Sequence, residues 1–319
     1  MENLNILVTG GCGFIGSNIV EYLLKNSVKS VRILDNLSTG FIENINPLLN
    51  KYNNLTYIHG DISNLDTCRK AVKNMDVICH QAALGSVPRS INDPLSSHIS
   101  NVNGFLNILI SAKEEGIKRI VYASSSSVYG DHKSLPKVEE KIGTVLSPYA
   151  ATKKIDEIYG NVFSRCYGLE CIGLRYFNVF GPKQNPGNPY AAVIPIFAKE
   201  FLTVGEITVN GDGETSRDFT FVQNVVQMND LCLFTEDKGA LNQIYNTACS
   251  ERISLNQMIS ALENTTGNKI KVNYGPERKG DIKHSEASIE KAKKLLGYEG
   301  LTYFNEGLRR TIEWLKDAT

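Results

Sequence analysis

The stretch VTGGCGFIGSN, residues 8–18, decides the fold. It follows a continuous apolar run, LNILV at 4–8, and leads into an amphipathic segment at 15–25. Gly10, Gly13 and Gly16 therefore lie between an expected strand and an expected helix. Small residues in that position let backbone N–H groups and the helix N-terminus approach a pyrophosphate. The spacing is G-x-x-G-x-x-G, a variant of the dinucleotide-binding pattern G-x-G-x-x-G.

The same alternation of apolar strand and helical pattern continues along the chain. Further strands are predicted at VRILD (31–35), LTYIHG (55–60), VICHQAA (77–83), RIVYASS (119–125) and CIGLRYF (171–177). Unbroken apolar strands separated by helices are typical of a parallel sheet covered on both faces. The sequence therefore predicts an α/β fold with a doubly wound, Rossmann-type parallel sheet.

A second, smaller α/β lobe is expected after residue 178. KQNPGNP (183–189) is a Pro/Asn/Gly loop, and the later strands and helices are shorter. FVQNVVQMNDLCLF (221–234) and QIYNTA (243–248) have the helix-then-strand character of the first lobe. We therefore expect a cofactor lobe of residues 1–178 plus 219–250, and a substrate lobe of residues 179–218 plus 251–319.

Composition excludes several classes of partner. Lys plus Arg and Asp plus Glu both number 34, so the net charge of zero favours neither nucleic acid nor an anionic membrane surface. The seven cysteines contain no C-x-x-C and are expected to be reduced core residues, and no metal site is predicted. No apolar run approaches the ~18 residues of a membrane span, and Met1 leads directly into a strand, so a cytoplasmic location is expected.

Asp35 indicates which dinucleotide the chain binds. It ends the second expected strand, 22 residues after Gly13, where its carboxylate can accept hydrogen bonds from both hydroxyls of the adenosine ribose. It would repel a 2′-phosphate, so NAD is predicted rather than NADP. Asp61, at the end of the third strand, is placed to meet the adenine amino group.

SPYAATKKIDEIY, residues 147–159, carries a second pattern. Ser147 suits an N-cap and Pro148 the first helical position, so Tyr149 and Lys153 would share one helix face. A Y-x-x-x-K also occurs at 129–133, but it contains Gly and Asp and is predicted to be a loop. The pattern alone does not separate a surface pair from a catalytic one.

Longer motifs resemble a known family. TGGCGFIG and the serine run SSSS (124–127), together with the Tyr149/Lys153 pair, are similar to the extended short-chain dehydrogenase/reductases. HQAALGSVPRSINDP (80–94), LRYFNVFG (174–181), YAAVIP (190–195) and NGDGETSRDF (210–219) resemble the UDP-N-acetylglucosamine 4-epimerases more closely. The resemblance covers almost the whole chain.

The resemblance implies a role for each matching residue. Tyr149 matches the family's base, Lys153 its partner on the nicotinamide ribose, and Ser125 the hydroxyl that bonds the 4-oxygen of the sugar. NAD-contacting positions fall on Phe14, Ile15, Asp35, Asn36, Gly40, Asp61, Ile62, Gln81, Ala82, Ala83, Leu84, Gly85, Asn101 and Phe177, besides the glycines. Substrate positions fall on Asn178, Arg217 and Arg278 for the diphosphate and nucleotide, Ala192, Thr208, Val209 and Asn210 for the uridine, and Ser86, Gln184 and Ser285 for the sugar.

The expected chemistry follows from these roles. A free tyrosine, with a pKa near ~10, is a poor base at neutral pH, but an adjacent ammonium and a positive nicotinamide favour its phenolate. Tyr149 can then take the proton of the sugar 4-hydroxyl while a hydride leaves for NAD, with Ser125 orienting the oxygen. Resembling dehydratases and decarboxylases carry a carboxylate just after the active hydroxyl, where this chain has Ser126 and Ser127. Re-reduction from the opposite face, and hence epimerisation at carbon 4, is the expected outcome.

The sugar is predicted from DIKHSEAS (281–288). In the resembling epimerases a tyrosine at the position of Ser285 accompanies restriction to non-acetylated hexoses, so serine favours UDP-N-acetylglucosamine and UDP-N-acetylgalactosamine. Three other functions stay open: a plain UDP-hexose or UDP-uronate epimerase, a nucleotide-sugar dehydratase or decarboxylase, and a catalytically silent NAD-binding module.

A homodimer is also expected, built on helices near 95–115 and 148–167. Apolar residues recur on both at helical spacing, and one apolar face of each would need a partner beyond the sheet. The residues are Phe105, Ile108, Leu109 and Ala112 on the first helix, and Ile155, Ile158, Val162 and Cys166 on the second.

Overall fold

The computed structural model describes residues 3–185, 187, 192–277 and 283–318. Its strands are β1 (Asn5–Thr9), β2 (Ser30–Asp35), β3 (Leu55–His59), β4 (Val77–His80), β5 (Arg119–Ser125), β6 (Glu170–Tyr176), β7 (Val179–Phe180), β8 (Glu206–Asn210), β9 (Ser216–Asp218), β10 (Thr220–Phe221), β11 (Ile244–Thr247), β12 (Arg252–Ser254) and β13 (Lys271–Gly275). Its α-helices are α1 (Phe14–Lys25), α2 (Asn46–Lys51), α3 (Leu65–Val72), α4 (Val87–Asn92), α5 (Pro94–His98), α6 (Gly104–Glu115), α7 (Pro148–Tyr167), α8 (Val193–Thr203), α9 (Val222–Phe234), α10 (Leu255–Thr266), α11 (Glu290–Leu296) and α12 (Phe304–Ala318). Shorter turns are η1 (Ile42–Asn44), the π turn η2 (Ile99–Asn103), η3 (Ser126–Tyr129) and η4 (Lys238–Ala240).

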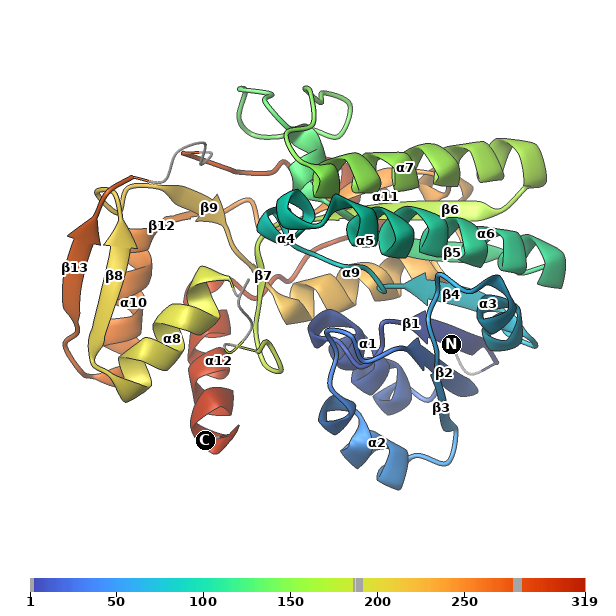
Figure 1. Cartoon of the computed structure of the whole chain (residues 1–319), viewed down its shortest axis with the longest axis horizontal. Helices are drawn as coiled ribbons and strands as arrows, with labels where there is room; N and C mark the ends of the chain where they lie inside the picture. The colour runs from blue at the N-terminus through green and yellow to red at the C-terminus, as the bar shows by residue number, and fades with distance from the viewer. Residues whose placement is uncertain (1–2, 186, 188–191, 278–282, 319) are drawn as a thin grey trace.

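The central sheet confirms the predicted doubly wound fold. Within the described residues it has seven parallel strands in the order β11-β6-β5-β4-β1-β2-β3 (Figure 1). β1 lies between β2 and β4, with Val8 opposite both Ile33 and Cys79. The strand order reverses there, and in such sheets ligands bind beyond the carboxyl ends of the strands at that point.

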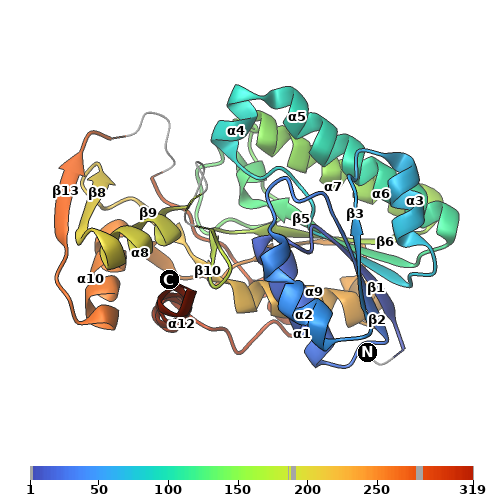
Figure 2. The ribbon, with the colours of Figure 1, turned by 60° about the horizontal axis from the view of Figure 1, so that its bottom comes forward.

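Apolar residues on both faces of each strand explain the burial of the sheet. In β1, Ile6 and Val8 pack in the core that contains α1, α2, α9 and α11, whereas Leu7 packs in the core that contains α3 and α6. All three are fully buried. Figure 2 shows the two groups of helices on opposite sides of the strands. The continuous apolar runs in the sequence therefore correspond to strands buried on both faces.

A third core lies apart from the sheet. It joins α8, α10 and α12 with residues of β7, β8 and β10, around Phe180, Phe219 and Phe304. Two small strand pairs border this core: β8 and β13 are parallel, and β9 and β12 are antiparallel. By contrast, residues 287–298, including α11, pack in a core of the central sheet although they lie within the range expected for the substrate lobe.

The helix expected near 95–115 is confirmed as a continuous helical segment made of α5, the π turn η2 and α6. Phe105, Ile108, Leu109 and Ala112 on α6 are fully buried in the protomer's own core. The assignment of these four residues to a free apolar face is therefore wrong, because α6 uses them to cover the sheet.

All seven cysteines are free thiols, and Cys166 is exposed while the other six are buried. Among the described residues, no helix combines the length and the apolar character that crossing a bilayer requires.

Candidate active site

A cavity of about 670 Å³ opens at the carboxyl ends of the central strands. Its volume is in the range of pockets that hold a small ligand or cofactor. It is lined by many of the residues singled out in the sequence: Gly10, Gly13, Phe14, Ile15, Gly16, Asp35, Asn36, Ile62, Gln81, Ala82, Ala83, Gly85, Ser86, Ser125, Tyr149, Lys153, Phe177, Asn178, Gln184 and Ala192.

The glycine loop is shaped for an anion. Gly10 has φ +69°, and a Cβ there would lie 2.7 Å from the backbone nitrogen of Ala82. A Cβ on Gly16 would lie 2.1 Å from the carbonyl oxygen of Gly10. Gly13 is the N-cap of α1 and supplies no side chain to cap the first-turn N–H groups. Those N–H groups, at the positive end of the helix dipole, fit the pyrophosphate of a dinucleotide.

Asp35 is held at the edge of the cavity by the backbone. Its Oδ2 accepts the N–H of Cys12 at 2.9 Å, and its Oδ1 accepts the N–H of Leu37 at 2.8 Å. Each carboxylate oxygen retains further acceptor capacity, so both can still receive ribose hydroxyls. The residues present therefore fit NAD.

Four of the predicted cofactor residues support the cavity wall without lining it. Gly40 packs on the glycine loop, where a Cβ would lie 2.8 Å from the carbonyl carbon of Cys12. Asp61 accepts the side-chain amide of Asn36 at 2.7 Å. Asn101 accepts the N–H of Leu84 at 2.8 Å and so fixes the loop after β4.

Tyr149 and Lys153 come from the first turns of α7. Ser147 is the N-cap, accepting the Ala150 N–H at 3.1 Å, and Pro148 begins the helix, as predicted. The N–H of Tyr149 donates to Ser90 Oγ at 3.0 Å. Both Tyr149 and Lys153 line the cavity, whereas Tyr129 ends η3 and residues 130–133 are not helical, as predicted for the second Y-x-x-x-K.

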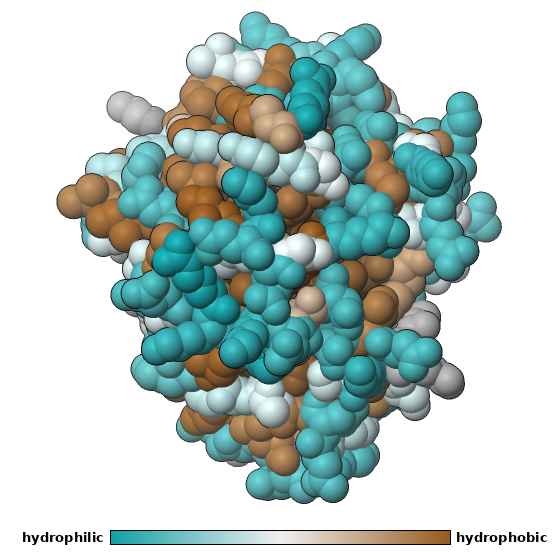
Figure 3. All heavy atoms as spheres, turned by 90° about the vertical axis from the view of Figure 1, so that its right-hand side faces the viewer, coloured by the Kyte–Doolittle hydropathy of each residue, from teal (hydrophilic) through white to brown (hydrophobic). Residues whose placement is uncertain are grey.

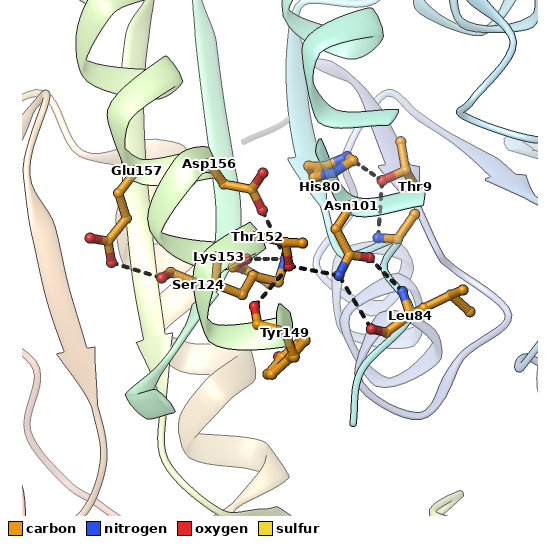
Figure 4. Close-up of polar contacts among 12 residues, drawn as sticks. Thr9, His80, Leu84, Asn101, Ser124, Tyr149, Thr152, Lys153, Asp156 and Glu157 are labelled. Atoms are coloured by element: carbon orange, nitrogen blue, oxygen red, sulfur yellow. Dashed lines mark hydrogen bonds and ion pairs between the residues drawn. The ribbon is translucent and has the colours of Figure 1, made fainter. Parts of the chain in front are cut away.

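The ammonium of Lys153 is fixed by two acceptors (Figure 4). Its Nζ donates to the carbonyl oxygen of Ala123 at 2.9 Å and to Oδ2 of Asp156 at 3.2 Å. His80 ends β4, the strand next to β5 in the sheet, and its Nδ1 lies 2.8 Å from Oγ1 of Thr9. Burial, followed by the charge of Lys153, lowers the pKa of His80 to about 3, so this imidazole is neutral.

Ser125, the last residue of β5, carries the hydroxyl that is expected to bond the 4-oxygen of the sugar. Ser125 caps η3, with its Oγ accepting the N–H of Ser127 at 3.1 Å, and it lines the cavity. Ser124 also lines the cavity, and its hydroxyl donates to Glu157 at 2.8 Å. The hydroxyl of Ser124 therefore donates to α7, whereas that of Ser125 acts only as an acceptor in the described contacts.

The charges that line the cavity suit diphosphate groups. Arg89, Lys153 and Lys183 contribute cations, and Lys183 also pairs with Glu21 at 2.8 Å. Among the described lining residues, Asp35 carries the only carboxylate. Sequence reasoning missed Arg89 and Lys183, although Arg89 lies inside the motif SVPRS and could have been noticed there.

Four of the predicted substrate residues that follow Ala192 in the sequence lie on β8 and β9. Thr208, Val209 and Asn210 are on β8, and the Val209 side chain is fully buried in the third core. Arg217 donates to the carbonyl oxygens of Ser216 and Lys283 at 3.0 and 3.2 Å. None of these four, nor Ser285, is among the residues that line the described cavity, and Arg278 lies outside the described residues.

The fold and this cavity define a class. A doubly wound sheet, a glycine loop opening α1, an acidic residue ending β2 and a Tyr/Lys pair on a cavity-lining helix are the features of a short-chain dehydrogenase/reductase that binds NAD. Residues 6–248 match the model of the NAD dependent epimerase/dehydratase family. The chain belongs to that family.

Named relatives cover nearly the full length. The chain is 36% identical over 314 residues to a putative UDP-glucose 4-epimerase of Methanocaldococcus jannaschii, covering 98% of each chain. It is 38% identical, with a TM-score of 0.92 and 100% of each chain covered, to the solved UDP-N-acetylglucosamine 4-epimerase of Methanobrevibacter ruminantium in complex with UDP-N-acetylmuramic acid. It is also 30% identical, with a TM-score of 0.91 over 99% of this chain and 100% of the other, to the Bacillus cereus UDP-glucuronic acid 4-epimerase in complex with UDP-glucuronic acid and NAD.

Proposed function

We propose that the chain inverts carbon 4 of a UDP-sugar, with UDP-N-acetylglucosamine and UDP-N-acetylgalactosamine as its preferred pair. The observation that carries the reaction type is the charge of the cavity wall. Among the described lining residues, Asp35 is the only carboxylate, and it ends β2 beside the glycine loop. Elimination or decarboxylation of a 4-keto sugar needs an additional acid or base near the sugar.

The chain's own residues perform the proton steps. Tyr149 takes the proton of the 4-hydroxyl and later returns it, Ser125 holds the oxygen, and Lys153 favours the phenolate of Tyr149. The glycine loop and Asp35 would hold NAD, which would supply a reversible hydride acceptor for carbon 4. Because the cofactor ends each turnover in its starting form, the protein should keep it bound.

The choice of sugar rests on the small side chain of Ser285. Its N–H donates to the carbonyl oxygen of Ser216 at 3.1 Å, which anchors the segment to β9. Its Oγ is buried and has no hydrogen-bond partner among the described residues. A serine at this position leaves space that the larger side chain of a tyrosine would fill.

A UDP-uronate is the second candidate, favoured by Arg89. This residue follows the N-cap Ser86 on α4, and both line the cavity. A guanidinium recognises a carboxylate in a bidentate manner, so Arg89 could select an acidic sugar if the sugar ring reaches α4.

Two lobes and two protomers complete the proposal. Residues 1–178 plus 219–250 would hold NAD, and residues 179–218 plus 251–319 would hold the UDP group. The homodimer would now rest on α5, η2 and α7, where Leu95, Ile99, Ile158 and Val162 are exposed. Figure 3 shows apolar side chains among polar ones towards the top of one face, at the height of α7 in Figure 1.

The test of the sugar choice is Ser285→Tyr against a panel of UDP-sugars. Acetylated substrates should lose most of their kcat/KM while plain hexoses lose little, since only the acetamido group meets the new ring. Equal losses for both would remove Ser285 from the choice. Preferred turnover of a UDP-uronate, abolished by Arg89→Ala, would establish the second candidate instead.

A further inference from the structure

A buried ion pair lies on α7, the helix that also carries the proposed base Tyr149. Lys153 and Asp156 lie one turn apart on α7, with side chains 3% and 2% exposed and Nζ 3.2 Å from Oδ2 (Figure 4). The other oxygen, Oδ1 of Asp156, is buried without a hydrogen-bond partner among the described residues. Burying a carboxylate with an unmet acceptor is costly, so its presence here calls for a function.

The next residue shows what a purely structural carboxylate looks like on the same helix. Glu157 is bound by the guanidinium of Arg175 at 2.8 and 3.0 Å, and it also accepts the hydroxyl of Ser124 at 2.8 Å. Both of its oxygens are satisfied by β5 and β6, which ties α7 to the sheet. Among the described residues, Asp156 makes no such bond to the sheet, and its side chain is bound by the proposed catalytic lysine.

Asp156 also restricts the direction in which the ammonium of Lys153 can donate its hydrogen bonds. An ammonium has three donors. One is directed to Ala123 on β5 and one to Asp156, and the side chain also lines the cavity. The remaining donor is therefore left for the cavity side, where a ribose hydroxyl of the cofactor would lie.

We propose that Asp156 is a positioning residue that aims the ammonium of Lys153 at the cavity and partly cancels its charge, and so sets the pH range in which Tyr149 can act as a base. This inference rests on the proposed role of Tyr149. A carboxylate beside the ammonium weakens the attraction that Lys153 exerts on a phenolate, and loss of that negative charge strengthens it.

The surroundings of the pair allow the charge of Asp156 to change near neutral pH. Burial raises the pKa of Asp156 to about 7, against the opposing effect of Lys153. The charge of Glu157 on α7 also raises the pKa of Asp156, and Asp156 in turn contributes to the raised pKa of Tyr122 on β5. The neutral His80 on β4 senses the charge of Lys153.

The charged groups on the other elements packed against α7 are engaged elsewhere or exposed. On α6, Lys113 lies over the ring of Tyr167, and Glu114 pairs with Arg69 at 2.8 Å. Glu115 of α6 accepts the backbone N–H of Asn74 at 2.8 Å, and His98 of α5 is exposed. From β6, Arg175 is bound to Glu157, and Arg89 of α4 lines the cavity.

The test compares Asp156→Asn with Asp156→Leu in the NAD-loaded protein. Asparagine keeps an acceptor oxygen for Lys153 and removes the charge, whereas leucine removes both. Tyrosinate absorbance is titrated in each protein and in its Tyr149→Phe counterpart, and the difference reports Tyr149 without any substrate. Asp218→Asn is the matched control, because Asp218 is likewise buried but lies on β9.

We expect Asp156→Asn to shift the difference titration, and the acidic limb of the kcat/KM profile, to lower pH by about 0.5–1 unit. Asp156→Leu should in addition lower kcat at the optimum by roughly 10-fold or more, which asparagine should largely avert. Asp218→Asn should leave the titration in place. An unshifted titration in Asp156→Asn, or a loss of thermal stability as its sole effect, would overturn the inference. A shifted titration in a protein that converts no UDP-sugar would instead refute the proposed function and leave the effect of Asp156 standing.

Discussion

The hydroxyl of Ser90 accepts the backbone N–H of Tyr149 at 3.0 Å, which joins α4 to the first turn of α7 beside the cavity. Ser90 is fully buried, and its own hydroxyl donates to the carbonyl oxygen of Val87 at 2.8 Å. The loop that lines the cavity after β4 and the helix that carries the proposed base are therefore held in one arrangement.

Ser90→Ala should weaken both stability and turnover. It leaves the partly buried N–H of Tyr149 without its acceptor, which should cost about 1 kcal/mol or more of unfolding free energy. Ser111→Ala is the control, because the buried hydroxyl of Ser111 on α6 has no hydrogen-bond partner among the described residues. Urea unfolding and steady-state kinetics of both variants check this, and equal stability losses would contradict it.

Tyr149→Phe should lower turnover by at least ~10²-fold, because it removes the ionisable oxygen while keeping the ring. Cofactor should stay bound. Tyr129→Phe is the matched control from the second Y-x-x-x-K, since the hydroxyl of Tyr129 donates to Asn246 at 2.6 Å and lies outside the described cavity lining. That variant should lose stability and retain most of its kcat. Near-normal turnover in Tyr149→Phe would remove it from the role of base.

Asp218 should make the protein less stable as pH rises from acid to neutral. Burial raises its pKa from 3.8 to about 7, although it accepts the N–H groups of Cys249 and Ala287. The folded state thus holds the proton more tightly than the unfolded state. Its stabilising contribution is present below about pH 4 and is lost as pH rises through about 7.

Asp218→Asn should therefore flatten the pH dependence of the unfolding free energy between these limits. Part of the slope should remain, because the pKa of Asp156 is raised to the same value. The exposed Asp237 offers the control Asp237→Asn, which should leave the curve unchanged. An unaltered slope in Asp218→Asn, measured by urea unfolding at a series of pH values, would contradict the assignment.

Ile158→Glu should convert a dimer to a monomer. Ile158 and Val162 on α7 are 52% and 42% exposed, and a charge placed in an apolar contact would stay unpaired. Val204→Glu, at an exposed position after α8, should leave the dimer intact. Light scattering at micromolar concentration measures both, and a monomeric wild-type protein would refute the dimer.

The strands of the central sheet could be predicted closely because the apolar pattern that defines each strand lies within a few consecutive residues. A run that is apolar at every position has few alternatives to a buried parallel strand, and the prediction at 119–125 coincides with β5. The predicted helix near 95–115 is also present, but the apolar spacing does not reveal the π turn within it at Ile99–Asn103. Nor can spacing say which apolar face covers the sheet, which is why Phe105 and its neighbours were misassigned.

Motifs located Tyr149, Lys153 and Ser125, since their spacing is set by one helix and one strand end. The sequence did not point to Ser90 or Asp156, because their roles depend on contacts between elements or on burial. Ser90 is 59 residues from Tyr149 in sequence. Asp156 resembles any surface acid of a helix until the structure places it inside.

The most direct test of the proposed function uses the purified protein without added cofactor. It is incubated with UDP-N-acetylglucosamine, the nucleotide sugars are separated, and the nucleotide released on denaturation is identified. We predict formation of UDP-N-acetylgalactosamine and release of NAD. Absence of conversion for this and every other UDP-hexose or UDP-uronate, in a protein that retains NAD, would contradict the account.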